Sequence, residues 1–163
     1  MGGKQCHSFL AGSIRGFSQE VTGVADPFNL ERFVEAQADV FAQVLAELGA
    51  GEKRSHWIWF IFPQMKGLGR SSLAEFYGIG SLAEAEAYLR HPVLGPRLVE
   101  CTRLVNQVEG RSIREILGYP DDLKFRSSMT LFARTAEENA KFDAALKKYF
   151  GGEADPLTEA MLR

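Results

Sequence analysis

The chain has 163 residues, 45% of them hydrophobic and 25% charged, which fits one ordinary globular domain and excludes a disordered or low-complexity protein. Its formal net charge of −2 argues against a nucleic-acid binder, and no apolar run approaches the roughly 18 residues of a membrane span. Two scattered cysteines, Cys6 and Cys101, favour a reducing compartment, so we expect a cytoplasmic protein.

The first 25 residues are rich in Gly and Ser and lack the apolar core of a signal peptide. We therefore predict a flexible N-terminal arm over 1–25 and a helical domain over 26–163. Asp26 and Pro27 open that domain with a capping acid and a proline suited to the first helical turn. An apolar stripe at helical spacing follows, up to the glycines at 49–51. Gln37 interrupts the stripe, which indicates either a kink between two shorter helices or a buried amide that holds its neighbours.

The aromatic segment 56–62, HWIWFIF, ends at Pro63 and by its pattern fits a buried strand or a buried helix equally well. We favour a helix, because no second strand-like run of comparable strength is present to pair with it.

Caps and apolar stripes predict further helices from Ser71 or Ser72 to Tyr77, from Ser81 to about Arg90, from Pro92 to about Val108, from Ser112, from Asp121 to Phe132, over 142–150 and over 157–162. Ser81 with Glu84, and Ser112 with Glu115, have the spacing of a capping box. The prediction is an all-α fold, a single multihelical globular domain. Its core should join Trp57, Trp59, Phe60, Leu98, Cys101 and Phe132. No strong apolar stripe is left over, so we expect a monomer or weak dimer.

Six segments also carry a resemblance: Arg32–Gln37, Arg54–Gln64, Gly67–Ser71, Tyr77–Ile79, Ala87–Leu98 and Leu123–Phe132. Together they resemble an uncharacterised bacterial family, catalogued as domain of unknown function 1810 and often labelled calpastatin. The resemblance covers about residues 27–162. It implies a multihelical fold, in agreement with the helical pattern, and implies no particular activity.

A basic block stands out in this acidic chain. From Lys53 to Arg70 the charge is +4 with no acid, whereas the other 145 residues carry −6. Such a block is usually a solvated loop, but a positive patch also concentrates anionic ligands. Within it, the glycine-containing loop 67–72 leads into a predicted helix. Its free N–H groups suit a phosphate or carboxylate, although the spacing is not that of a P-loop and the loop could equally be a simple turn.

Polar residues interrupt two apolar helical faces. Arg97 lies at the centre of the stripe that begins at Val93, where its permanent charge needs an acid, carbonyl groups or a ligand anion as a partner. Lys124, Arg126 and Ser127 interrupt the helix that begins at Asp121. Burying them unpaired would be costly, so they either bond to internal carbonyls and acids or line a polar pocket.

The histidines and cysteines indicate no reaction. His56 and His91 have no Cys, Asp or Glu at ligand spacing, so each is interpreted as hydrogen-bonded into the packing rather than as a zinc ligand. Cys101 lies on an apolar stripe, which is typical of a core residue. No Ser-His-Asp or Cys-His order stands out, and we expect neither a metal nor a cofactor.

Two hypotheses follow. In the first, a basic polar cleft binds, or binds and turns over, a small phosphorylated or otherwise anionic metabolite, with no nucleic acid or membrane as a partner. Its ligand-binding residues would be His56, Gln64, Lys66, Arg70, Ser71, Arg97, Lys124, Arg126 and Ser127. In the second, the chain is a helical protein–protein interaction module without catalytic activity. The first requires the cations of distant segments to converge on one concave surface, whereas the second expects them paired with acids or spread over the exterior.

Overall fold

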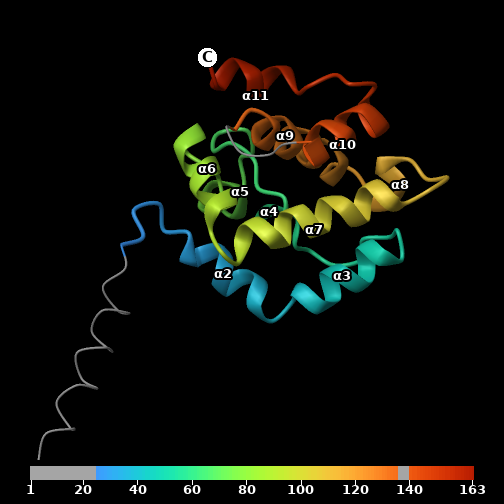
Figure 1. The fold of residues 1–163 in the computed structure, drawn as a ribbon, viewed down its shortest axis with the longest axis horizontal. Coiled ribbons are helices and arrows are strands. Elements are labelled where there is room, and N and C mark those ends of the chain that lie inside the picture. The colour runs from blue at the N-terminus through green and yellow to red at the C-terminus, as the bar shows by residue number, and fades with distance from the viewer. Residues whose placement is uncertain (1–24, 136–139) are drawn as a thin grey trace, which may run out of the picture.

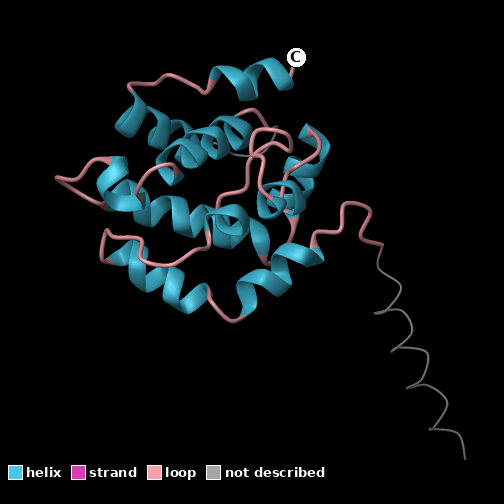
Figure 2. Ribbon diagram, turned by 180° about the vertical axis from the view of Figure 1, so that it is seen from behind, coloured by secondary structure: helices cyan, strands magenta, loops and turns pink. Residues whose placement is uncertain are grey.

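The computed structural model describes residues 25–135 and 140–163, and within these ranges the chain forms ten helices and no strand (Figure 2). The helices are α2 (Glu31–Ala38), α3 (Phe41–Gly49), α4 (Ile58–Ile61), α5 (Ser72–Phe76), α6 (Leu82–Arg90), α7 (Leu94–Gln107), α8 (Ile113–Leu117), α9 (Asp121–Ala133), α10 (Ala140–Phe150) and α11 (Pro156–Met161). The all-α prediction is therefore confirmed. The predicted N-terminal arm lies outside the described residues, apart from Ala25. No described helix is both long and apolar enough to span a lipid bilayer.

Serine side chains cap three of the helices. Ser71, Ser81 and Ser112 each accept a hydrogen bond from a backbone N–H one turn ahead, at 3.1 Å. Ser112 and Glu115 form the complete capping box that their spacing predicts. The second predicted box is only half formed, because the Glu84 carboxylate bonds to other groups instead of the Ser81 N–H.

The helix predicted after Pro27 starts later in the chain than its apolar stripe indicates. The backbone at Asn29 is left-handed, with φ at 52°, so α2 begins only at Glu31. Asp26 still caps this turn, accepting a hydrogen bond from the Leu30 N–H at 2.7 Å.

Gln37 fulfils both of its predicted roles. It lies next to the break between α2 and α3, and its side chain is buried. Its amide nitrogen donates to the Phe60 carbonyl at 2.7 Å and to the Tyr88 hydroxyl at 3.1 Å. One buried amide therefore joins α2 to α4 and α6.

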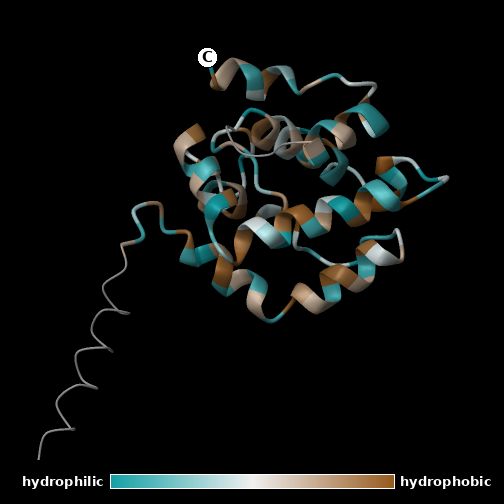
Figure 3. Cartoon of the chain, in the orientation of Figure 1, coloured by the Kyte–Doolittle hydropathy of each residue, from teal (hydrophilic) through white to brown (hydrophobic). Residues whose placement is uncertain are grey.

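Helix α7 crosses the middle of the molecule, with α3 on one side and α10 on the other (Figure 1). Hydrophobic and hydrophilic residues are interspersed along α3 and α7, as expected of helices that bury one face and expose the other (Figure 3). Helix α7 begins at Leu94 rather than at Pro92, and the His91 Nδ1 accepts a hydrogen bond from the Leu94 N–H at 3.3 Å. His91 is thus bonded into the packing, as predicted.

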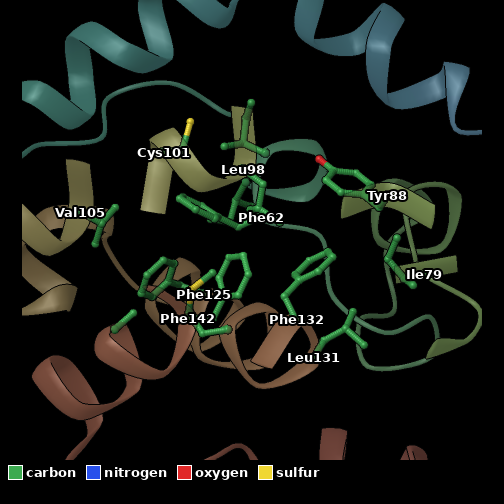
Figure 4. Packing of buried hydrophobic residues seen from close by; sticks show 14 of the residues in the cluster. Phe62, Ile79, Tyr88, Leu98, Cys101, Val105, Phe125, Leu131, Phe132 and Phe142 are labelled. Carbon is green, nitrogen blue, oxygen red and sulfur yellow. The ribbon is translucent and has the colours of Figure 1, made fainter. Parts of the chain in front are cut away.

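The core prediction is confirmed for Trp57, Leu98, Cys101 and Phe132, which are at most 1% exposed and belong to one cluster. Figure 4 shows Leu98 among the aromatic residues of this cluster. For Trp59 and Phe60 the prediction holds only in part, since both pack against this cluster but are only partly buried. Helix α4 directs Ile58 and Ile61 into the core, and this spacing leaves Trp59 and Phe60 at the margin.

Leu98→Ala should lower the free energy of unfolding by about 2–5 kcal/mol, because it leaves a cavity in a core position that is 1% exposed. Urea denaturation measures the loss. Leu73→Ala is the matched control, since Leu73 is 45% exposed and its truncation should cost less than about 0.5 kcal/mol. Similar losses for the two variants would show that α7 does not face the core in this way.

Candidate functional site

A cleft of about 280 Å³ lies between the loop that follows Pro63, the first half of α9 and the start of α11. We call it the α9 cleft. Part of the predicted ligand-binding set lines it, namely Gln64, Lys124, Arg126 and Ser127, together with Leu68, Asp155 and Leu157. Its volume is near the lower end of the range of small-molecule sites, about 300–1,000 Å³.

Backbone hydrogen bonds fix the Gln64 side of the cleft. The Ile79 N–H donates to the Gln64 carbonyl at 2.9 Å, and the Lys66 N–H donates to the Ile79 carbonyl at 2.8 Å. These bonds form an isolated parallel bridge between Met65 and Ile79. The loop then passes so close to α5 that a Cβ at Gly69 would lie 2.5 Å from that of Ala74. The glycine therefore permits the approach of the loop to α5.

Gln64 and Lys124 both line the cleft, the first from the loop that follows Pro63 and the second from α9. The Gln64 side-chain amide makes no hydrogen bond with any residue that the structure describes. The Lys124 ammonium lies 5.0 Å from the ring centre of Trp59 and 3.7 Å from a carboxylate oxygen of Asp121, which is too far for a hydrogen bond. Both side chains therefore have donors left for a ligand.

Asp121 does not fully neutralise Lys124, because it is shared with a second lysine. Its other oxygen lies 2.8 Å from the Lys53 ammonium, whose side chain is only 6% exposed. Lys53 also donates to the Ser55 carbonyl at 2.5 Å. The group of two lysines and one carboxylate therefore carries one net positive charge, and Lys124 is the more exposed of its two cations.

Arg126 and Ser127 hold the segment that leads into α11. The Arg126 guanidinium donates to the carbonyls of Glu153 and Ala154, at 3.0 and 3.2 Å. The Ser127 hydroxyl lies 3.2 Å from an Asp155 carboxylate oxygen. Both alternatives raised by the sequence therefore apply: these side chains satisfy internal carbonyls and an acid, and they also line the cleft.

Arg70 and Ser71 lie near the cleft but outside its lining. Arg70 borders a second cavity of about 440 Å³, which shares Leu68 and Leu157 with the α9 cleft. Its side chain is exposed and forms no ion pair or hydrogen bond within the described ranges. The Ser71 hydroxyl is occupied as the cap of α5, accepting from the Ala74 N–H at 3.1 Å.

The remaining predicted site residues are not brought to the cleft. Arg97 lies over the Phe41 ring, 4.5 Å from its centre, with one nitrogen 3.3 Å from the Gln37 side-chain oxygen. Lys66 lines a separate cavity and pairs with Glu75 at 3.6 Å. His56 is exposed. The expected meeting of Arg97 with Arg70 and Arg126 in one pocket does not occur, because Arg97 packs where α7 contacts α2 and α3.

Two residues of this neighbourhood were absent from the sequence-based set. Asp121 stands three residues before Lys124, and this helical spacing was an available signal for an ion pair. Trp59 carried no comparable signal, because its contact with Lys124 joins distant segments. The Trp59 indole nitrogen is buried and has no hydrogen-bond partner in the described structure.

No group of three His, Cys, Asp or Glu side chains in residues 25–135 and 140–163 is placed to hold a metal ion.

Comparison with known proteins places these features in a family context. A family model described as "Protein of unknown function (DUF1810)" matches residues 27–162. A crystal structure of the conserved hypothetical protein Rv1873 from Mycobacterium tuberculosis is 64% identical, with a TM-score of 0.83. The match covers 84% of this chain and 98% of that one. A search of curated proteins found no significant match.

Proposed function

Since this chain belongs to the DUF1810 family of proteins of unknown function, we propose a function from its own geometry: the α9 cleft binds a small organic anion, such as a phosphorylated metabolite. The observation that carries the proposal is the pair of unfilled donors, the Gln64 amide and the Lys124 ammonium, on the same cavity. An anionic oxygen suits both groups, and a hydrogen bond that involves a charged group is about twice as strong as a neutral one.

The acid in the cleft, Asp155, is engaged by the first turn of α11. One oxygen of the Asp155 carboxylate already accepts from the Thr158 N–H at 3.0 Å and from the Thr158 hydroxyl at 2.6 Å. Asp155 thus serves mainly as the cap of α11. Arg126 adds a second positive charge to the lining, although it donates to backbone carbonyls and lies 3.6 Å from a carboxylate oxygen of the exposed Glu153. Among the charged residues that line the α9 cleft, the two cations Lys124 and Arg126 outnumber the one acid, Asp155.

We also propose a cytoplasmic location, and the state of the Cys101 thiol supports it. Its thiol is free and buried, and burial raises its pKa to about 12, so that it stays protonated and unreactive. A free thiol retained in the core is typical of a reducing compartment.

A second candidate, a protein-interaction module, is favoured by one observation. Leu73 and Phe76 are large apolar residues on the short helix α5, and both are about half exposed, at 45% and 54%. Three-residue spacing places them on one face of that helix. This reading becomes the better one if the chain binds no small anion.

Lys124→Ala should abolish stabilisation by a small anion. The assay is a thermal shift with inorganic phosphate and a panel of phosphorylated metabolites. A ligand at about one hundred times its Kd adds about 2.7 kcal/mol to the free energy of unfolding of the wild type. That gain corresponds to a rise in Tm on the order of 5–10 °C. The variant should show little rise, because the cleft loses its least neutralised cation.

The control for this experiment is Lys147→Ala, which removes an exposed lysine from another helix, α10. It should respond to the ligand as the wild type does. Equal stabilisation of the Lys124 variant and the wild type, or no stabilisation of the wild type by any anion of the panel, would count against the proposal.

A further inference from the structure

We infer that the ligand of the α9 cleft is an elongated molecule, with an apolar middle and an acidic group at each end. This inference rests on the proposed function and adds the shape and chemical class of the ligand. It comes from the second cavity, which we call the α11 cavity and which is bordered by Gly67, Leu68, Arg70, Leu157, Ala160 and Met161.

The two cavities adjoin each other. Leu68 and Leu157 line both of them, and the inferred ligand would pass over these side chains from the α9 cleft into the α11 cavity. Their volumes are about 280 and 440 Å³. Taken together they match the size of a metabolite site, about 300–1,000 Å³, rather than the broad surface of a protein interface.

The path between the two ends is apolar because of how α11 packs. Within α11 only Thr158 is buried, whereas Leu157 is 66% exposed and Met161 is 43% exposed. The helix is attached to α9 by polar contacts, including an ion pair between Arg134 and Glu159 and a hydrogen bond from the Ser127 hydroxyl to Asp155. Its apolar side chains therefore line the α11 cavity instead of filling the core, and an apolar ligand body would remove them from water.

Positive charge lies at both ends of this path. Lys124 stands at the α9 end, and Arg70 is the charged residue among the described lining of the α11 cavity. Arg70 has no acidic partner in the described ranges, so it is available to a carboxylate or phosphate. A molecule with one acidic group would engage only one of these cations, whereas one with two acids and an apolar spacer engages both.

The test is a titration of the full chain, followed by NMR, with three probes: succinate, sebacate and decanoate. The longer diacid should bind at least about tenfold more tightly than succinate, because additional CH₂ groups become buried. Arg70→Ala should reduce the affinity for sebacate to that for decanoate, and Lys124→Ala should weaken all three. The control is Arg54→Ala, which removes an exposed arginine that pairs with Glu52 outside the path.

The outcomes separate this inference from the proposed function. Equal affinity for succinate and sebacate, with both dependent on Lys124, overturns the inference and leaves anion binding in place. Decanoate binding as tightly as sebacate, with no effect of Arg70→Ala, also overturns it. Absence of Lys124-dependent binding for every probe contradicts both proposals. An unchanged NMR spectrum outside the probed regions verifies that these variants remain folded.

Discussion

Replacing Arg32 with methionine should lower the free energy of unfolding by about 3–5 kcal/mol. The Arg32 and Glu84 side chains are 8% and 9% exposed, and their charged groups lie 2.8 Å apart. The guanidinium also donates to the backbone carbonyls of Phe28, Asn29, Phe76 and Gly78. Its removal leaves the Glu84 carboxylate buried without its counter-charge. It also removes the hydrogen bonds that join α2 to the end of α5 and the start of α6. Urea denaturation at neutral pH measures the loss.

A matched surface pair provides the control. Arg103 and Glu100 are also in hydrogen-bond contact, but their side chains are about 40% exposed. Arg103→Met should therefore cost no more than about 1 kcal/mol. If Arg32→Met were as mild as Arg103→Met, the pair with Glu84 would not hold α2, α5 and α6 together.

Glu47→Ala should destabilise the protein by about 2–4 kcal/mol, because one buried carboxylate holds the start of the basic segment. It accepts from the backbone N–H groups of Arg54 and Ser55, from the Ser55 hydroxyl at 2.6 Å and from the Trp57 indole N–H at 3.0 Å. Truncation leaves these donors unsatisfied near the core. Glu75→Ala is the control, since Glu75 is an exposed acid at the surface and should matter little.

The Glu47 carboxylate should also make the free energy of unfolding depend on pH in the acid range. Burial raises the pKa of Glu47, but hydrogen bonds from Ser55, Arg54 and Trp57 outweigh burial and lower it from 4.5 to about 2. A depressed pKa contributes stability above the unfolded value, and this contribution is lost as the pH falls from about 4.5 towards 2. With solvent screening it amounts to about 1–3 kcal/mol.

Urea midpoints measured between neutral and acid pH check this dependence. The wild type should lose more stability than Glu47→Gln over the acid range, because the glutamine side chain does not titrate. Parallel pH profiles for the two proteins would contradict the role assigned to Glu47.

Local sequence signals predicted most of the helical fold. The serine caps at 71, 81 and 112 act within one turn of chain, so their spacing was sufficient to locate three helix starts. Gln37 was recognisable because a single polar residue on an apolar stripe has to be satisfied inside the protein. The positions of Trp59 and Phe60 were not recognisable. A four-residue helix with large apolar residues on every side has no pattern that distinguishes its inner face.

The candidate site was predictable only in part, because its polar partners come from remote segments. Lys124 was identified as a cation that interrupts an apolar helical face and Gln64 was in the predicted set, and the structure places both on the α9 cleft. Arg97 was identified by the same reasoning, yet its partners are an amide and an aromatic ring from α2 and α3. Arg126 bonds to carbonyls near residue 154, which no local pattern links to α9. The need for a partner could be inferred from sequence, but the partner itself depended on the tertiary packing.

The most direct test of the anion-site proposal is to map phosphate binding on the full chain by the changes in backbone amide NMR shifts during a titration. The account predicts that shifts change together at residues 64–70 and at residues 123–127, the two walls of the α9 cleft, and that Lys124→Ala removes these changes. Changes confined to the surroundings of Arg97 or of Arg54, or the same changes in the Lys124 variant, would contradict it.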